Sequence, residues 1–470
     1  MQQCRKVAKP LDRQHYTGSP LANRTDKYVS RLPLGLLLLG FGALLALNWP
    51  GQMSYDSVVQ LADGRSGQYD SWHPPVMAWL LGLFDGILPG TGLFLLFTAL
   101  LLLSAWLILL KGASGGWGLV ILTVLIFATP QLALYQGTIW KDVLFANAAI
   151  AAFAFLAAAA GHWRRPGPRF LLLGLAAATL SLAALARQNG FLLLPVAAFV
   201  LGVVAQKQRA SAWRYGLALL LSSLVLIAGA NFALSFKSDH GEGASEQLRL
   251  AQTYDLVAAV RLDPTIRLEL FEKQAPSLNA AIRKDGVALY SARLVDTLEQ
   301  SAFLTEAIYH TPPGLVFAQW RQLILSHPGL YWRERLSVFR WLVAPPDLIV
   351  CHPDVVGVDG PADMLKSLGL KEQIRPQDRL LYNYVANFFH TPVLSHLLYG
   401  ALALLFLCLL VRRGEPPDIA IAGLQVAALV FAASFFVISI ACDYRYLYFL
   451  DLAAMTGALQ FLAGRRHPLA

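Results

Sequence analysis

The sequence predicts an all-α polytopic membrane protein, built as a bundle of about ten transmembrane helices. The chain of 470 residues is 56% hydrophobic and only 14% charged, whereas a soluble protein of this size carries about a quarter charged residues. Its mean hydropathy is +0.51. Apolar runs of roughly 17 to 23 residues recur along it, and such a run crosses the ~30 Å hydrocarbon core of a bilayer.

Ten apolar runs are expected to span the membrane. They cover 33–49, 91–110, 116–130, 142–160, 170–186, 190–205, 215–236, 393–411, 419–441 and 447–463. The apolar stretch 75–88 is shorter and carries Asp85. We expect it to form a juxtamembrane or shallow re-entrant helix, and an eleventh full span is the alternative.

The basic residues predict the orientation of these spans. They gather in the N-terminal arm and in alternate connectors, whereas the intervening short connectors contain only Arg65, Lys141, Arg187 and Arg445. By the positive-inside rule, both termini are expected in the cytoplasm. A full span at 75–88 would turn every later Arg-rich connector outward. The net charge of +9 is explained by this placement, so no nucleic-acid partner is expected.

The apolar runs divide the chain into four expected parts. Between Lys237 and Thr391 lie 16 Lys or Arg and 18 Asp or Glu residues, so this polar segment is nearly neutral and does not predict a nucleic-acid surface. The parts are a cytoplasmic basic arm (1–32), an N-terminal transmembrane module (33–236) with a catalytic outer loop (50–90), an extracytoplasmic helical domain (237–392) and a C-terminal transmembrane module (393–470).

The first outer loop concentrates groups that suit work on sugars. It carries the carboxylates Asp56, Asp63 and Asp70 together with His73 and several aromatic residues. Aromatic rings stack on sugar faces, and a carboxylate can take a proton from a hydroxyl group. The alternative is a solvated loop with interfacial aromatic residues.

Further charges stand at the outer ends of later spans, where they are costly unless they are paired or functional. Lys141 and Asp142 begin one span, and Arg187 lies between two others. Arg187 is expected either to bind a phosphate or to pair with a carboxylate. Arg445 stands two residues after Asp443, and a pair between these two is the structural alternative.

Two cysteines are also expected on the outer side. They are Cys351 and Cys442, and the sequence leaves open whether they form a disulfide.

At these residues the chain resembles the GT-C superfamily of glycosyltransferases that use polyprenyl-phosphate sugars. This superfamily includes protein O-mannosyltransferases and the aminoarabinose transferase that modifies lipid A. The resemblance covers about the first 240 residues and the final stretch. It is carried by Tyr55-Asp56 followed by Trp72-His73-Pro74-Pro75, by Asp142 opening a span after a short outer loop, and by Arg445-Tyr446 before the last span.

The resemblance implies a GT-C-like bundle and roles for individual residues. Asp56 is expected to be the general base and Asp142 a second carboxylate near the donor. Many members have a second acid where this chain has Ser57, which leaves a divalent metal requirement open, and Asp63 or Asp70 is a candidate substitute. The remaining candidates are substrate-binding: Lys141, Arg187 and Arg445, which by charge and topology would stabilise the leaving phosphate, and Tyr55, Trp72, His73 and Tyr446.

The resemblance also implies a hexosyl- or pentosyltransferase in a bacterial inner membrane, with its active site on the extracytoplasmic side. The expected donor is a sugar on a polyprenyl phosphate. The acceptor stays open among a glycolipid, a polysaccharide and a protein, and membrane lipid is the expected surrounding. Two alternatives remain at this point, namely a multispan lipid or polysaccharide transporter and an O-antigen polymerase or ligase.

Overall fold

The computed structural model describes residues 29, 31–69, 73–236, 243–294, 296–351 and 354–464. Within these ranges every regular element is a helix, and β pairing is limited to isolated bridges. Eight stretches are long and apolar enough to cross a membrane, which confirms the expected all-α multispan fold. They are α5 (Gly92–Leu110), α8 (Lys141–Gly161), α9 (Pro166–Ala186), η1 with α10 (Gln188–Lys207), α11 (Ala212–Ser235), α21 (His396–Arg413), α22 (Pro416–Ile438) and η6 with α23 (Tyr444–Ala463).

Three further apolar helices are shorter. α2 (Leu32–Asn48) has 17 residues, α4 (Pro75–Ile87) has 13 and α6 (Trp117–Phe127) has 11. With 13 residues, α4 is shorter than an ordinary membrane span, as expected for a juxtamembrane helix. The span expected over 116–130 is corrected, because its helix ends at Phe127. Pro130 disfavours helical geometry at the residue before it, and it begins the separate short helix α7 (Pro130–Tyr135).

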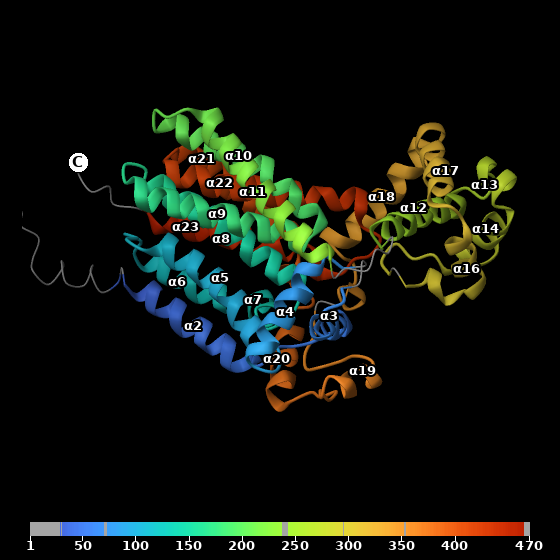
Figure 1. Cartoon of the computed structure of the whole chain (residues 1–470), viewed down its shortest axis with the longest axis horizontal. Helices are drawn as coiled ribbons and strands as arrows, with labels where there is room; N and C mark the ends of the chain where they lie inside the picture. Colours follow the sequence, from blue (N-terminus) through green and yellow to red (C-terminus); the bar gives the residue numbers. More distant parts are fainter. Residues whose placement is uncertain are drawn as a thin grey trace, which may run out of the picture.

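The bundle is organised around α8. This helix contacts α5, α9, α22 and α23, and all its residues from Asp142 to Ala160 are buried inside the protein. Its many alanines are small enough to let the neighbouring helices approach closely. α2 begins and α23 ends at one end of the bundle, whereas α3, α4 and α20 lie at the other (Figure 1). The first residues of α8 therefore belong to the end that carries the outer loops.

The first outer loop is a tightly packed pair of helices, α3 (Tyr55–Ser66) and α4. They cross where Gly64 meets Gly82. A Cβ on Gly82 would lie 2.2 Å from the carbonyl oxygen of Gly64, so only glycine allows this approach. Arg65 also donates two hydrogen bonds to Asp85, at 2.8 and 2.9 Å. The helix that carries Asp56 is thus held firmly against α4.

The polar segment between the two groups of spans packs in two different ways. Its first half has a hydrophobic core of its own and extends away from the bundle (Figure 1), whereas its second half packs on the bundle. The first half contains α12 (Gly243–Leu262), α13 (Glu269–Gln274), α14 (Pro276–Ala281), η2 (Ile282–Gly286), α15 (Val287–Leu289), η3 (Leu298–Gln300), α16 (Ala302–His310) and α17 (Pro313–Ser326). The second half contains α18 (Pro328–Val343), η4 (Ile349–Cys351), α19 (Ala362–Ser367), α20 (Pro376–Ala386) and η5 (Pro392–Leu394).

The outer helices join the bundle just after α22. Arg335 of α18 forms a buried ion pair with Asp255 of α12. It also donates hydrogen bonds to the carbonyl oxygens of Val437 and Ser439, at 3.0 and 2.8 Å. Three residues further on, Cys442 forms a disulfide with Cys351. The segment that leads into Arg445 is therefore held from both sides.

Candidate functional site

The first and second outer loops are joined at their backbones. The amide of Gln52 donates to the carbonyl of Gly137 at 2.8 Å, and the amide of Ile139 donates to the carbonyl of Gln52 at 2.9 Å. The hydroxyl of Ser57 donates to the carbonyl of Ile139 at 2.7 Å. Because Asp56 neighbours Ser57 and Lys141 follows Ile139 closely, these bonds bring the start of α3 to the start of α8.

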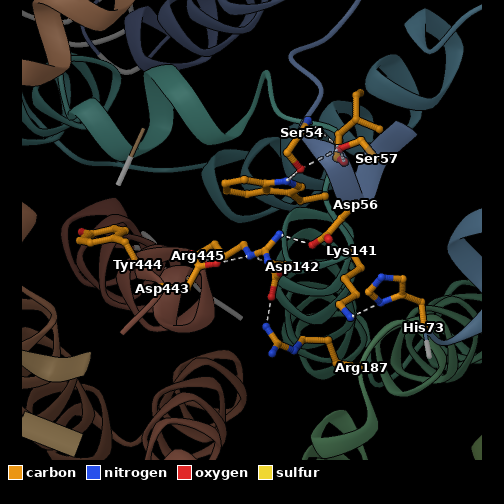
Figure 2. A network of polar contacts seen from close by, with 12 residues as sticks. Ser54, Asp56, Ser57, His73, Lys141, Asp142, Arg187, Asp443, Tyr444 and Arg445 are labelled. Carbon is orange, nitrogen blue, oxygen red and sulfur yellow. Dashed lines mark hydrogen bonds and ion pairs between the residues drawn. The ribbon is translucent and has the colours of Figure 1, made fainter. Parts of the chain in front are cut away.

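Arg445 lies at the centre of a cluster of charged side chains and links the carboxylates of Asp56, Asp142 and Asp443 (Figure 2). Its guanidinium donates to Asp56 at 2.7 Å and pairs with Asp443 at 2.7 Å. Its Nε lies 3.9 Å from a carboxylate oxygen of Asp142. The guanidinium carbon also lies 4.7 Å from the ring centre of Trp140, close enough for cation–π attraction. Segments almost 400 residues apart in the chain thus meet at one side chain.

Arg187 forms the second layer of the cluster. Its guanidinium contacts the carboxylate of Asp142 (Figure 2), and the two side chains are only 11% and 2% exposed. The guanidinium carbon lies 5.3 to 5.8 Å from the ring centres of Phe431, Phe435 and Tyr446. Arg187 therefore pairs with a carboxylate, which was one of the two arrangements expected from the sequence.

Lys141 contacts a histidine at the edge of this group of charges. Its ammonium lies 3.0 Å from Nδ1 of His73 (Figure 2). Among the described residues, no carboxylate oxygen lies within 4.0 Å of it. Because its closest partner is an imidazole and not a carboxylate, the Lys141 side chain is a candidate partner for an anionic group.

Asp56 is held in its ionised form. Burial alone would raise the pKa of its carboxyl group, but the positive charges of Arg445, His73 and Lys141 and the hydrogen bond from Arg445 outweigh burial, so the pKa lies below the ordinary 3.8. With 24% of its side chain exposed, Asp56 remains accessible. An ionised and partly exposed carboxylate can accept a proton from an acceptor group.

The other predicted residues differ in their placement. Tyr446 stacks on Phe435 beside Arg187, with ring centres 5.5 Å apart. Tyr55 is 59% exposed, and it makes none of the contacts that hold the cluster together. Trp72 and Asp70 lie outside the described residues.

Two members of the cluster were not among the predicted site residues. Trp140 packs against Arg445 and donates from its indole nitrogen to the Ser54 hydroxyl at 2.8 Å. Asp443 was considered only as a structural partner of Arg445. The available signal for Trp140 was its position directly before Lys141 and Asp142. This signal was weak, because aromatic residues at span edges commonly lie at the membrane interface.

The carboxylates do not form a metal-ligand set. Asp56, Asp142 and Asp443 each face a guanidinium. Within the described ranges, no three His, Cys, Asp or Glu side chains are grouped so that they could hold a metal ion. Carboxylates that each face a guanidinium do not fit a divalent metal site.

Comparison with known proteins gives matches to solved structures alone. No family model and no curated protein matches the chain. The oligosaccharyltransferase AglB from Archaeoglobus fulgidus, in complex with an inhibitory peptide and a dolichol-phosphate, is 16% identical with a TM-score of 0.38 over 92% of this chain and 50% of that one. The A. fulgidus oligosaccharyltransferase tethered to an acceptor peptide with the NVT sequon is 14% identical, with a TM-score of 0.41 over 92% and 49%. The chain thus spans about half the length of these proteins, and similarity at this level assigns no substrate and no residue role.

Proposed function

We propose that the chain is an integral membrane glycosyltransferase of the GT-C type, which moves a sugar from a polyprenyl phosphate to an extracytoplasmic acceptor. The observation that carries this proposal is the position of Arg445. One guanidinium joins Asp56 of the first outer loop to Asp443 and reaches Asp142 at the start of α8. Lys141, the residue before Asp142, places its side-chain nitrogen 3.0 Å from His73. An ionised carboxylate and several basic side chains thus stand together at one end of the helix bundle.

The chemistry follows from these charges. The carboxylate of Asp56 takes the proton from the acceptor nucleophile, which forms a new bond to the anomeric carbon of the sugar. The bond between that carbon and the phosphate oxygen breaks, and polyprenyl phosphate leaves with the electron pair. Arg445 and Lys141 stabilise the negative charge that develops on the departing phosphate. Because Asp142 balances the charge of Arg187, we assign Arg187 the role of orienting the Asp142 carboxylate.

The location of the cluster suits a lipid-linked donor. The phosphate of such a donor lies at the headgroup level, and its tail lies in the hydrocarbon. The cluster occupies the ends of spans, where charged side chains reach this level. The disulfide between Cys351 and Cys442, next to Asp443, supports an oxidising extracytoplasmic compartment. The acceptor stays open among glycolipid, polysaccharide and protein.

Deletion of the gene tests the proposal. Mass spectra of envelope glycolipids, polymers and glycoproteins are expected to show one missing hexose, pentose or aminosugar. Wild-type protein and an Asp85→Asn variant should restore it, whereas Asp56→Asn should not. Asp85 is the matched control because it also pairs with an arginine in the same outer loop. Unchanged spectra would refute the transferase, and accumulation of an intact lipid-linked polymer would favour a transporter or a polymer ligase instead.

A further inference from the structure

A buried polar network contacts the turn of residues 443–446, which carries Arg445 and is called the Arg445 turn below. His396 begins α21 and Asp451 lies one turn into α23, and both side chains are fully buried. Nδ1 of His396 lies 2.8 Å from a carboxylate oxygen of Asp451, and Nε2 lies 3.0 Å from the backbone carbonyl oxygen of Tyr444. The proposed reaction uses neither residue.

The bonding partners determine the direction of these hydrogen bonds. Gln131 donates to the Tyr444 hydroxyl at 3.0 Å, so this hydroxyl donates its own proton to Asp451, also at 3.0 Å. The backbone carbonyl of Tyr444 can only accept, so Nε2 of His396 must carry a proton. Asp451 bonds to the other ring nitrogen and thereby fixes the ring orientation. This holds whether the proton between His396 and Asp451 belongs to the imidazole or to the carboxyl group.

The carbonyl bound in this way belongs to the residue before Arg445. A buried carbonyl oxygen that loses its hydrogen bond is destabilised, so this bond favours one backbone conformation of the turn. On the other side of the same turn, Asp443 caps η6 by accepting from the amide of Arg445 at 3.2 Å. The direction in which the Arg445 side chain leaves the backbone depends on both constraints.

We propose that His396, oriented by Asp451, is a positioning residue that fixes the Asp443–Tyr446 turn and thereby aims Arg445 at Asp56. Its effect on sugar transfer rests on the proposed function, whereas its effect on the turn does not. The two parts are therefore tested separately.

Hydrogen–deuterium exchange of the purified full-length protein tests the effect on the turn. In His396→Ala, the amides of residues 444–447 should exchange about tenfold faster, because an opening held by one buried bond of about 1.4 kcal/mol becomes easier. His396→Gln, whose side-chain amide can donate to the same carbonyl, should recover part of the protection. Tyr448→Phe is the matched control, since it removes a buried hydroxyl bonded to Gln136 at 2.8 Å without touching the Tyr444 carbonyl. Unchanged exchange at the turn, or faster exchange spread evenly over α21 to α23, would overturn the proposal.

A double-mutant cycle tests the effect on Arg445. The probe is farnesyl phosphate, whose binding to the protein in detergent is measured by calorimetry. Arg445→Gln and His396→Ala should each weaken binding by about tenfold, and the double variant should be no weaker than Arg445→Gln alone, because residues that act through one another are not additive. Fully additive losses would assign His396 a general structural role and overturn the proposal. Absence of wild-type binding would count against the proposed function, while the exchange experiment still decides the positioning role.

Discussion

The guanidinium of Arg187 contacts the carboxylate of Asp142, and the two side chains are 11% and 2% exposed. Removing one partner of a buried ion pair leaves an uncompensated charge and costs about 3–5 kcal/mol. We therefore expect Arg187→Ala to lower the thermal unfolding temperature of the purified protein clearly. Adding Asp142→Asn to that variant should recover much of the loss, because it removes the stranded charge.

The cycle of single and double variants distinguishes this pair from a phosphate ligand. If Arg187→Ala leaves the unfolding temperature unchanged but weakens the binding of farnesyl phosphate, Arg187 serves the donor and not Asp142. Arg65→Ala is a suitable control. Arg65 also pairs with an aspartate, Asp85, but its side chain is 32% exposed, so its loss should cost about 1 kcal/mol or less.

The pH dependence of sugar transfer should report the state of Asp56. Burial raises the pKa of Asp56, but the combined effect of Arg445, His73 and Lys141 is larger and brings the pKa below 3.8. A base with a lowered pKa keeps its active, ionised form at all higher pH. The acid limb of kcat/KM should therefore lie below the ordinary range of an aspartate.

His73→Asn checks this assignment. The charge of His73 contributes to the lowered pKa of Asp56. Without that charge, the acid limb of kcat/KM should move to higher pH by a fraction of a unit. An acid limb near neutral pH in the wild-type protein would remove Asp56 from the role of base.

The sequence was informative about which segments form apolar helices and where charged residues lie along them. Hydropathy located the ten apolar segments, and the positive-inside rule predicts that α4 is not one of the spans. The charges at the outer span ends stood out because neither the bilayer nor the orientation rule explains them. The pair of Asp443 and Arg445, which are two residues apart, was one of the two arrangements expected from the sequence. For α6, hydropathy overestimated the helix because it does not register the break before Pro130.

The sequence did not determine which distant charges meet. Asp56 and Arg445 are separated by 389 positions, and His396 and Asp451 by 55. Such contacts depend on how whole helices pack, and a single sequence contains no record of that packing. The roles of Trp140 and His396 were missed for the same reason. Each contributes through a contact with the Arg445 turn, which lies elsewhere in the chain.

The disulfide between Cys351 and Cys442 should stabilise the protein and order the site. It closes a segment of 91 residues, and a cross-link over a long segment typically contributes about 2–4 kcal/mol. We expect the double variant Cys351→Ser/Cys442→Ser to unfold at a lower temperature and to transfer sugar more slowly, because Cys442 neighbours Asp443. Cys408→Ser is the control, as this exposed cysteine is free. A double variant with wild-type activity and stability would contradict the prediction.

Glu334 should make stability depend on pH. It is 5% exposed, and burial raises its pKa from 4.5 to about 7, with Asp255 adding to the shift while Arg335 and Arg261 oppose it. Between these values the folded state binds more protons than the unfolded state, so stability falls as pH rises. The loss should amount to about 3 kcal/mol at most.

Replacing the carboxyl group isolates this effect. Glu334→Gln should flatten the decline between pH 4.5 and 7 and make the protein more stable than wild type above pH 7. Thermal unfolding over that pH range measures both. An equally steep decline in the variant would assign the pH dependence to another group, with Asp255 as the next candidate because its pKa is also raised by burial.

Reporter fusions test the orientation of the bundle. Gly115 lies beside the end of α23, where its amide donates to the carbonyl of Ala463 at 3.1 Å, so a fluorescent protein fused after Gly115 should fold in the cytoplasm and fluoresce. Gly360 lies against Val58 of α3, so alkaline phosphatase fused after Gly360 should be exported and active. If the Gly115 fusion reports the outer side, α4 crosses the membrane after all. Every later connector would then be inverted, and the lipid phosphate would have to meet Arg445 from the cytoplasmic leaflet.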